Sequence, residues 1–145
     1  LAKQFGSGQK YMKGDHNQLQ QVFTNIINNA MHAMPDGVVL TIATREVENP
    51  QPAMKTGRVK ADKYVEIAFT DTGCGIAKEH IAKIFDPFFT TKEPGKGTGL
   101  GLSISYSIIK DHCGWIDVKS VVGEGTTFLI LLPVNNENGV VQFTA

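Results

Sequence analysis

One long helix constrains the fold of this chain most strongly. Residues 15–33 carry apolar side chains at spacings of three and four, which predicts an amphipathic helix that packs through one stripe. That stripe consists of Leu19, Val22, Phe23, Ile26, Ile27 and Ala30. Asp15 is the expected N-cap. The helix should end at Met34, because Pro35 cannot continue the hydrogen-bond ladder and Gly37 permits a turn.

The rest of the chain predicts a sheet and two more helices. Residues 77–85 should form a short helix, 86–98 a mobile loop, and 99–112 a helix that Gly114 caps in the left-handed conformation. Residues 49–62 read as a hairpin loop. Strands are expected over 10–13, 38–47, 64–70, 115–121 and 126–132.

This order of elements predicts an α+β fold. We expect a two-layer α/β sandwich in which a mixed sheet of about five strands carries three helices on one face. The chain has 145 residues, 41% of them hydrophobic, which suits one domain with one core. Its 14 basic and 14 acidic residues balance, without a long basic run, so no nucleic-acid partner is expected.

The cysteines and the chain ends bear on location. Cys74 and Cys113 lack the spacing of a metal site, so we expect two free thiols in a reducing cytoplasm. Neither a signal peptide nor an apolar run of membrane-spanning length is present in the sequence. Because the first residue is Leu1 rather than Met, we expect a piece of a longer protein, with any membrane attachment in its other regions.

Two asparagines on the long helix are candidate site residues. Asn25 and Asn29 lie four apart, so their carboxamides project from the same face, one turn from each other. A carboxamide oxygen is a hard ligand, and Mg²⁺ that also binds phosphate needs only one or two protein ligands. Asparagine is a poor helix former, which favours a functional role over the alternative of a solvated helix surface.

The strand over 64–70 ends at Asp71, the first residue of the sequence DTGCGI. A carboxylate there can accept a hydrogen bond from the exocyclic amine of adenine, whereas guanine would present a repelling carbonyl oxygen. Gly73 and Gly75 allow close approach of the backbone. The alternative is an Asx-turn that caps the next helix.

A second glycine-rich turn precedes the last predicted helix. Gly97, Gly99 and Gly101 lead into that helix, whose N-terminal amides and dipole favour phosphate oxygens. Such a loop is a weak signal alone, and the sequence matches neither the GxxxxGK[ST] loop nor the dinucleotide-binding arrangement. Taken with the asparagines and Asp71, it predicts a site for an adenine nucleotide and Mg²⁺.

Four segments in order carry a resemblance to a known family. QVFTNIINNAMHAM, DTGCGI, IFDPFFTTK and GKGTGLGLSIS resemble the N box, first glycine box, F box and second glycine box of the catalytic, ATP-binding domain of sensor histidine kinases. The final hairpin also resembles the family's C-terminal strands. The resemblance implies the Bergerat ATP-binding fold, shared with DNA gyrase B, MutL and a heat-shock chaperone. It implies a catalytic domain over 1–134 and a tail or linker over 135–145.

The resemblance also assigns roles to residues. Asn29 becomes the Mg²⁺ ligand and Asp71 the adenine partner, while Phe88 and Phe89, with Phe85, would anchor a flexible lid over ATP. Thr126 or Thr127 would hold an adenine-bound water. The full set implied for the nucleotide is Asn29, His32, Asp71, Gly73, Gly75, Ile76, Phe85, Thr91, Gly97, Thr98, Gly99, Leu100, Gly101 and Thr126.

The position four residues before the metal asparagine separates the chemistries of the superfamily. Its ATPases place a glutamate there to activate water, whereas Asn25 cannot act as a general base, which favours a kinase. A basic residue often follows the metal asparagine by three positions, and here it is His32. Lys92 and Lys96 are better candidates to offset charge on the transferred phosphoryl group.

The expected activity is that of a protein-histidine kinase acting on another domain. His16, His32, His80 and His112 are not followed by an acidic residue, so none is the expected acceptor. The acceptor would lie on the kinase's dimerisation domain, a response regulator would follow in the pathway, and this chain alone should bind ATP and transfer little. Three alternatives stay open: an ATP hydrolase or clamp, a nucleotide-sensing module, and a serine-directed kinase of the anti-sigma-factor type.

Overall fold

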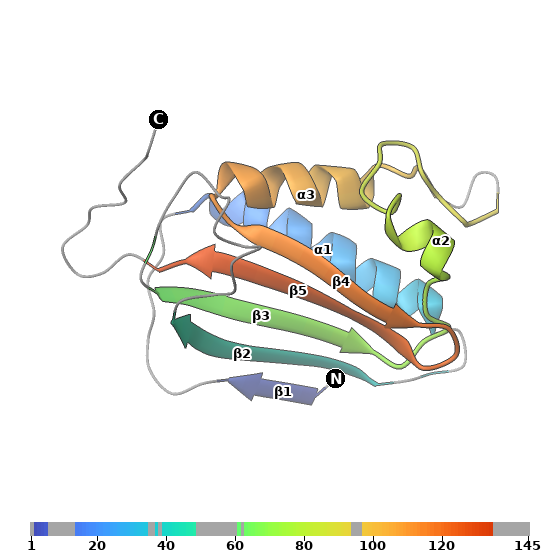
Figure 1. The fold of residues 1–145 in the computed structure, drawn as a ribbon, viewed down its shortest axis with the longest axis horizontal. Coiled ribbons are helices and arrows are strands. Elements are labelled where there is room, and N and C mark those ends of the chain that lie inside the picture. The colour runs from blue at the N-terminus through green and yellow to red at the C-terminus, as the bar shows by residue number, and fades with distance from the viewer. Residues whose placement is uncertain are drawn as a thin grey trace.

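The computed structural model describes residues 2–5, 14–34, 37, 39–48, 61, 63–93 and 97–134. Within them the strands form one sheet in the order β1-β2-β3-β5-β4, with β1 parallel to β2 and the other pairs antiparallel (Figure 1). In chain order the elements are β1 (Ala2–Phe5), α1 (His16–Ala33), β2 (Leu40–Glu48), β3 (Lys63–Asp71), α2 (Lys78–Ile81), α3 (Gly101–Asp111), β4 (Trp115–Val121) and β5 (Gly125–Pro133).

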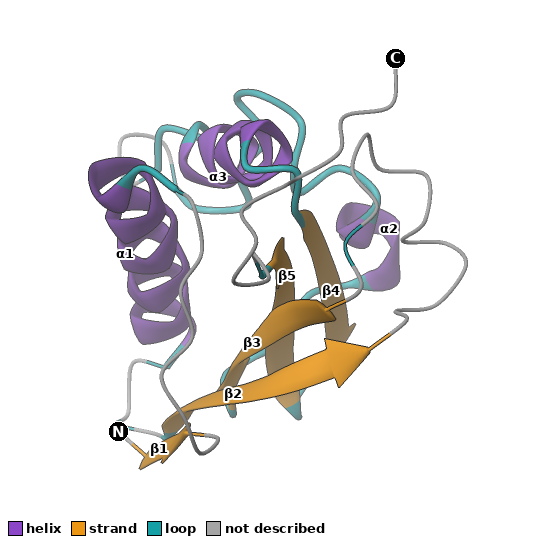
Figure 2. Cartoon of the chain, turned by 90° about the vertical axis from the view of Figure 1, so that its left-hand side faces the viewer, coloured by secondary structure: helices purple, strands orange, loops and turns teal. Residues whose placement is uncertain are grey.

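The core lies between the helices and one face of the sheet. The apolar stripe of α1 packs inward, with Val22 and Ile26 fully buried, and the ring of Phe23 lies 5.6 Å from that of Phe69 on β3. Ile109 of α3 and Ile130 of β5 are equally buried. Figure 2 shows α1 and α3 over the same side of the sheet. The predicted two-layer α+β fold is therefore confirmed.

The opposite face of the sheet holds a buried glutamate in an ion pair. Glu66 lies three residues from Phe69 on β3, so it projects away from the core. It is buried there by a two-pronged ion pair with Arg45 on β2. The hydrogen bonding to Glu66 raises the pKa of Arg45 most, and the negative charge of the same carboxylate raises it further. No helix among the described residues has the length and apolarity needed to cross a membrane.

Polar contacts at one end fix how α1 lies against α3. Asp15 caps α1, because its carboxylate accepts from the backbone N–H groups of Asn17 at 2.8 Å and Gln18 at 3.0 Å. The backbone N–H of Asp15 donates to Nε2 of His112 at 2.9 Å, and Nδ1 of His112 donates to the carbonyl of Ile108 at 2.8 Å. The His112 ring is thus a neutral link from the end of α3 to the start of α1.

Several predicted boundaries differ from the structure. Strand β1 lies at Ala2–Phe5, whereas the strand predicted over 10–13 falls outside the described residues, as does most of the predicted loop over 49–62. Helix α2 ends at Ile81, well before the predicted residue 85. Beyond it the backbone forms tight turns. The backbone N–H of Lys83 donates to the carbonyl of His80, and the N–H of Asp86 donates to the carbonyl of Lys83.

The predicted cap of α3 is wrong in detail. Cys113 takes the left-handed conformation with φ of 57°, and Gly114 does not. The N–H of Gly114 bonds the carbonyl of Ile109 at 2.8 Å, and that of Cys113 bonds Lys110 at 2.9 Å, which is a Schellman motif. Glycine is needed at 114 for space, since a Cβ there would lie 2.6 Å from the carbonyl oxygen of Leu131.

We therefore expect opposite effects of two substitutions in this cap. Gly114→Ala should lower the free energy of unfolding by roughly 1–3 kcal/mol, because the added methyl group collides with β5. Cys113→Gly should raise it by about 0.5–1 kcal/mol, because relief of left-handed strain outweighs the added freedom of the unfolded chain. Urea denaturation measures both values, and a stabilising Gly114→Ala would contradict this explanation of the cap.

Candidate functional site

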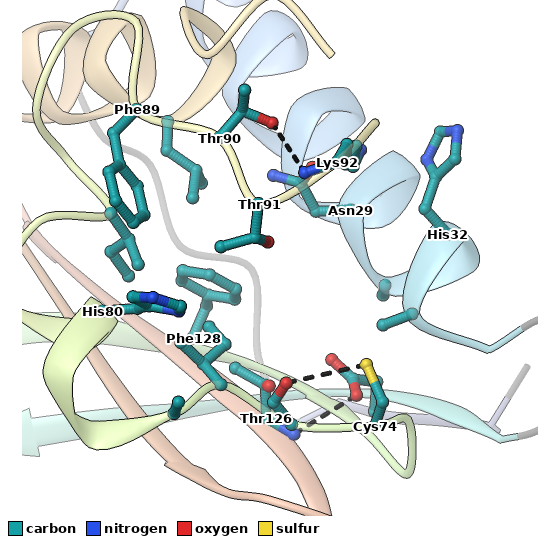
Figure 3. A pocket seen from close by; sticks show the side chains of 18 residues that line it. Asn29, His32, Cys74, His80, Phe89, Thr90, Thr91, Lys92, Thr126 and Phe128 are labelled. Carbon is teal, nitrogen blue, oxygen red and sulfur yellow. Dashed lines mark hydrogen bonds between the residues drawn. The ribbon is translucent and has the colours of Figure 1, made fainter. Parts of the chain in front are cut away.

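Two adjoining cavities open between α1, α2, the α2–α3 loop and the helix-facing side of the sheet, and Figure 3 shows the side chains that line the first. The first cavity, of about 310 Å³, contains the base-side residues Asp71, Ile76, Thr126 and Phe128. The second cavity, of about 280 Å³, contains Asn25 and the glycine-rich turn before α3. Both are lined by Asn29, Ile84, Phe89, Thr90, Lys92 and Leu102, so the two form one continuous site.

Asp71 presents one carboxylate oxygen to the first cavity. The residue is 4% exposed at the end of β3. Its Oδ1 accepts from the backbone N–H of Gly73 at 2.9 Å and from that of Thr126 at 3.2 Å. No described residue donates to Oδ2. A carboxylate held through Oδ1 leaves Oδ2 as an acceptor for an amine of a ligand. The exocyclic amine of adenine is a donor of this kind.

The turn after Asp71 is held against the β4–β5 hairpin. The hydroxyl of Ser120 accepts from the backbone N–H of Ile76 at 2.8 Å and lies 2.9 Å from the hydroxyl of Thr126. Gly75 has a φ of 72°, and a Cβ there would lie 2.2 Å from the carbonyl oxygen of Val121. The turn can therefore approach the hairpin only with glycine at this position.

Asn29 and Lys92 meet where the two cavities join. The ammonium Nζ of Lys92 lies 3.4 Å from Oδ1 of Asn29, and Figure 3 shows the two side chains side by side. The asparagine oxygen thus already faces a cation, which fits the hard oxygen ligand that Mg²⁺ prefers. His32 lies exposed at the rim of the first cavity, with Nδ1 against the carbonyl of Asn28.

Asn25 turns its amide nitrogen toward α3. Its Nδ2 donates to the carbonyl of Gly101 at 3.0 Å and lies 3.3 Å from the hydroxyl of Ser105. The side chain also lines the second cavity. The residue four before Asn29 is therefore a bridge between the two long helices as well as a wall of the site.

The α2–α3 loop is closed at its base by one backbone bond. The N–H of Phe88 donates to the carbonyl of Gly99 at 2.9 Å. Phe88 itself has a φ of 67° and is 75% exposed, so its ring does not pack as an anchor. Phe89 does pack, edge-on against His80 at 5.5 Å between ring centroids, and Phe85 lies 5.4 Å from Tyr106.

The structure gathers most of the residues proposed from the sequence. Of the nucleotide and catalytic sets, the cavities are lined by Asn25, Asn29, His32, Asp71, Gly75, Ile76, Thr91, Lys92, Gly97, Thr98, Gly99, Gly101 and Thr126. Gly73, Phe85 and Leu100 line neither cavity; a Cβ on Gly73 would collide with Ala33. Lys96 lies outside the described residues.

Some of the residues that line the first cavity were not predicted from the sequence. His80 and Phe128 line the first cavity and lie outside the four motif segments. Ile84 and Leu102 also line it and lie within those segments, but they were assigned no role. Phe128 could have been found, because it follows Thr126 by two positions on β5 and so projects from the same face. Ser120 was missed because its role depends on the pairing of β4 with β5, where it lies opposite Thr126.

Known proteins resemble this chain in sequence and in fold. A sequence model of the family described as histidine kinase-, DNA gyrase B-, and HSP90-like ATPase matches residues 14–136. The sensor kinase CckA of Brucella abortus (strain 2308) is 49% identical over 124 residues, which cover 84% of this chain and 13% of that protein. Sporulation kinase C of Bacillus subtilis (strain 168) is 39% identical over 127 residues, covering 88% of this chain and 26% of that protein.

Solved structures agree with the fold. The catalytic domain of histidine kinase ThkA, in a nucleotide-free form, matches with a TM-score of 0.72 and 28% identity, covering 91% of this chain and 76% of that chain. The chain spans only a small part of the curated relatives named above. It belongs to the family of histidine kinase-, DNA gyrase B- and HSP90-like ATPases and is, within that family, an ATP-binding catalytic domain of the sensor histidine kinase type.

Proposed function

We propose that this domain binds Mg²⁺ and ATP and positions the γ-phosphoryl group for transfer to a histidine on a separate dimerisation domain of the same cytoplasmic kinase. A response regulator would then receive the phosphoryl group. The observation that carries the proposal is the single open oxygen of buried Asp71, aimed into a cavity that continues to Asn29 and the glycine-rich turn. We place this domain over 1–134, with 135–145 as a tail or linker; the family match over residues 14–136 supports the larger part of the first range.

The base and the phosphates would lie at opposite ends of the joined cavities. The adenine amine would donate to Oδ2 of Asp71, with apolar contacts from Ile76 and Phe128. The phosphates would reach the turn formed by Gly97, Gly99 and Gly101, whose backbone can come close to anions. This direction brings the γ-phosphate toward Lys92, Asn29 and the exposed base of the α2–α3 loop.

Asn29 would hold Mg²⁺ through Oδ1. When bound, the ion would supply positive charge that offsets the charge of the phosphates. The ammonium of Lys92 would offset charge on the transferred group from the loop side. Asn25 carries no carboxylate that could take a proton from water, so the site favours phosphoryl transfer over hydrolysis.

Two of the four histidines in this domain, His112 and His80, are poorly suited as acceptors. Both ring nitrogens of His112 are engaged by backbone groups in the link between α1 and α3. The ring of His80 packs on Phe89. These placements support an acceptor histidine outside this domain.

Asp71→Asn tests the base end of the site. The carboxamide is close in shape to the carboxylate, but its Oδ1 would stay bonded to the N–H groups of Gly73 and Thr126 and leave an NH₂ group facing the adenine amine. We expect calorimetric titration with a non-hydrolysable ATP analogue to show about a 100-fold loss of affinity. The thermal unfolding midpoint serves as the control for folding, and unchanged affinity would overturn the adenine assignment.

Asn29→Ala tests the metal end. Among the described residues, Asn29 has the only carboxamide that lines both cavities. Its removal should abolish the gain in affinity that Mg²⁺ gives the ATP analogue, while affinity without Mg²⁺ stays close to that of the unaltered domain. Gln21→Ala, on an exposed face of α1, is the matched control and should keep the full magnesium response. A normal magnesium response in Asn29→Ala would refute this ligand.

The identity of the acceptor can be tested in the full-length protein. Incubation with ATP labelled at the γ-phosphate should give protein-bound label that is lost in acid and kept in base, because a phosphorus–nitrogen bond to imidazole is acid-labile. The label should be absent from the Asn29→Ala protein. Acid-stable label would instead support the serine-directed alternative, and release of free phosphate without protein label would support the hydrolase.

A further inference from the structure

Ser105 is the one fully buried hydroxyl among the described residues of α3. It is the last residue of the segment GKGTGLGLSIS, and the resemblance assigned it no role. It is 0% exposed in a stretch of the helix that also buries Ile108 and Ile109. A hydroxyl in such surroundings costs free energy unless it forms hydrogen bonds. Its partners therefore indicate why the position holds serine rather than alanine.

The hydroxyl of Ser105 acts both as a hydrogen-bond donor and as an acceptor. Its Oγ donates to the carbonyl of Gly101 at 2.8 Å, one turn earlier in α3. It also lies 3.3 Å from Nδ2 of Asn25 on α1, which supplies it with a donor across the helix interface. The same Nδ2 donates to the Gly101 carbonyl at 3.0 Å. Three residues of two helices thus share one closed set of hydrogen bonds.

These bonds determine how Asn25 is turned. The Gly101 carbonyl can only accept, so the amide nitrogen of Asn25, and not its oxygen, must face α3. No described residue donates to Oδ1 of Asn25, and this side chain lines the second cavity. Asn25 therefore presents an acceptor oxygen to that cavity and keeps its donors in the helix interface.

The contact lies at the phosphate end of the site. Gly101 is the first residue of α3 and lines the second cavity beside Gly97 and Gly99. Asn25 lies one turn before Asn29 on the same face of α1. A shift of one helix against the other would move the glycine amides relative to Asn29, and the bonds to Asn25 oppose that shift.

We propose that Ser105 is a positioning residue for the phosphates of the nucleotide, acting through Asn25. Its hydroxyl holds the Asn25 carboxamide and the first turn of α3 in one arrangement, so that the glycine-rich turn and Asn29 meet the phosphates together. This inference rests on the proposed function of the site. Ser105 lines neither cavity and so touches no ligand itself.

The test compares two nucleotides that share a base but differ in phosphates. Ser105→Ala should weaken binding of a non-hydrolysable ATP analogue with Mg²⁺ by roughly three- to tenfold, the range for one lost hydrogen bond. Binding of AMP, which depends mainly on the base end, should stay unchanged. Ser107→Ala is the matched control, because Ser107 makes the same kind of bond to the preceding turn at 3.2 Å but is exposed. It should leave both affinities unchanged.

A double substitution tests the route through Asn25. In an Asn25→Ala background, adding Ser105→Ala should not weaken binding of the ATP analogue further, since the partner of the hydroxyl across the helix interface is already gone and only its bond to Gly101 within α3 remains. Equal losses for AMP and the analogue, a matching loss in Ser107→Ala, or additive losses in the double variant would each overturn the positioning role. Failure of the unaltered chain to bind either nucleotide would overturn the proposed function itself.

Discussion

The packing of α1 against α3 is the contact on which the site depends, because each helix supplies part of the wall of the second cavity, where the phosphates are proposed to bind. Apolar side chains such as Ile26 and Ile109 provide the burial, but apolar surfaces tolerate sliding. Polar bridges at the two ends of α3 restrict this sliding. At one end the backbone N–H of Asp15 donates to His112, and at the other the side-chain amide of Asn25 donates to the Gly101 carbonyl. Hydrogen bonds need defined distances and angles, so these bridges fix the register of the two helices.

The base end is built on a different principle. Asp71 ends a central strand, and its neighbour β5 supplies the N–H of Thr126 to the same carboxylate oxygen. Because backbone groups satisfy Oδ1, the carboxylate is fixed before any ligand arrives and its second oxygen has a defined direction. Ser120 adds a further constraint by holding the following turn through Ile76. Such preorganisation reduces the ordering cost that binding must overcome.

The sequence predicted what local chemistry determines and missed what the tertiary structure determines. The cap at Asp15 and the positions of Asn29 and Asp71 follow from helix periodicity and turn residues, and the structure places them as those patterns require. The left-handed residue after α3 could not be chosen correctly, because only the approach of β5 shows that Gly114 is needed for space. Ser105 gave no signal, since its partner lies eighty positions away in the chain.

Asn25 contributes both to the packing of α1 against α3 and to the choice between phosphoryl transfer and hydrolysis that we propose for the site. The Gly101 carbonyl facing it can only accept a hydrogen bond, so a donor is required there, and the amide nitrogen of Asn25 supplies it. A carboxylate in the same place would meet that carbonyl oxygen with no proton to donate, and the hydrogen bond from α1 to the start of α3 would be lost. The bond that holds the two helices together therefore selects a side chain that cannot activate water. Under the proposed function, retention of the γ-phosphoryl group for an acceptor would follow from the way the helices are packed.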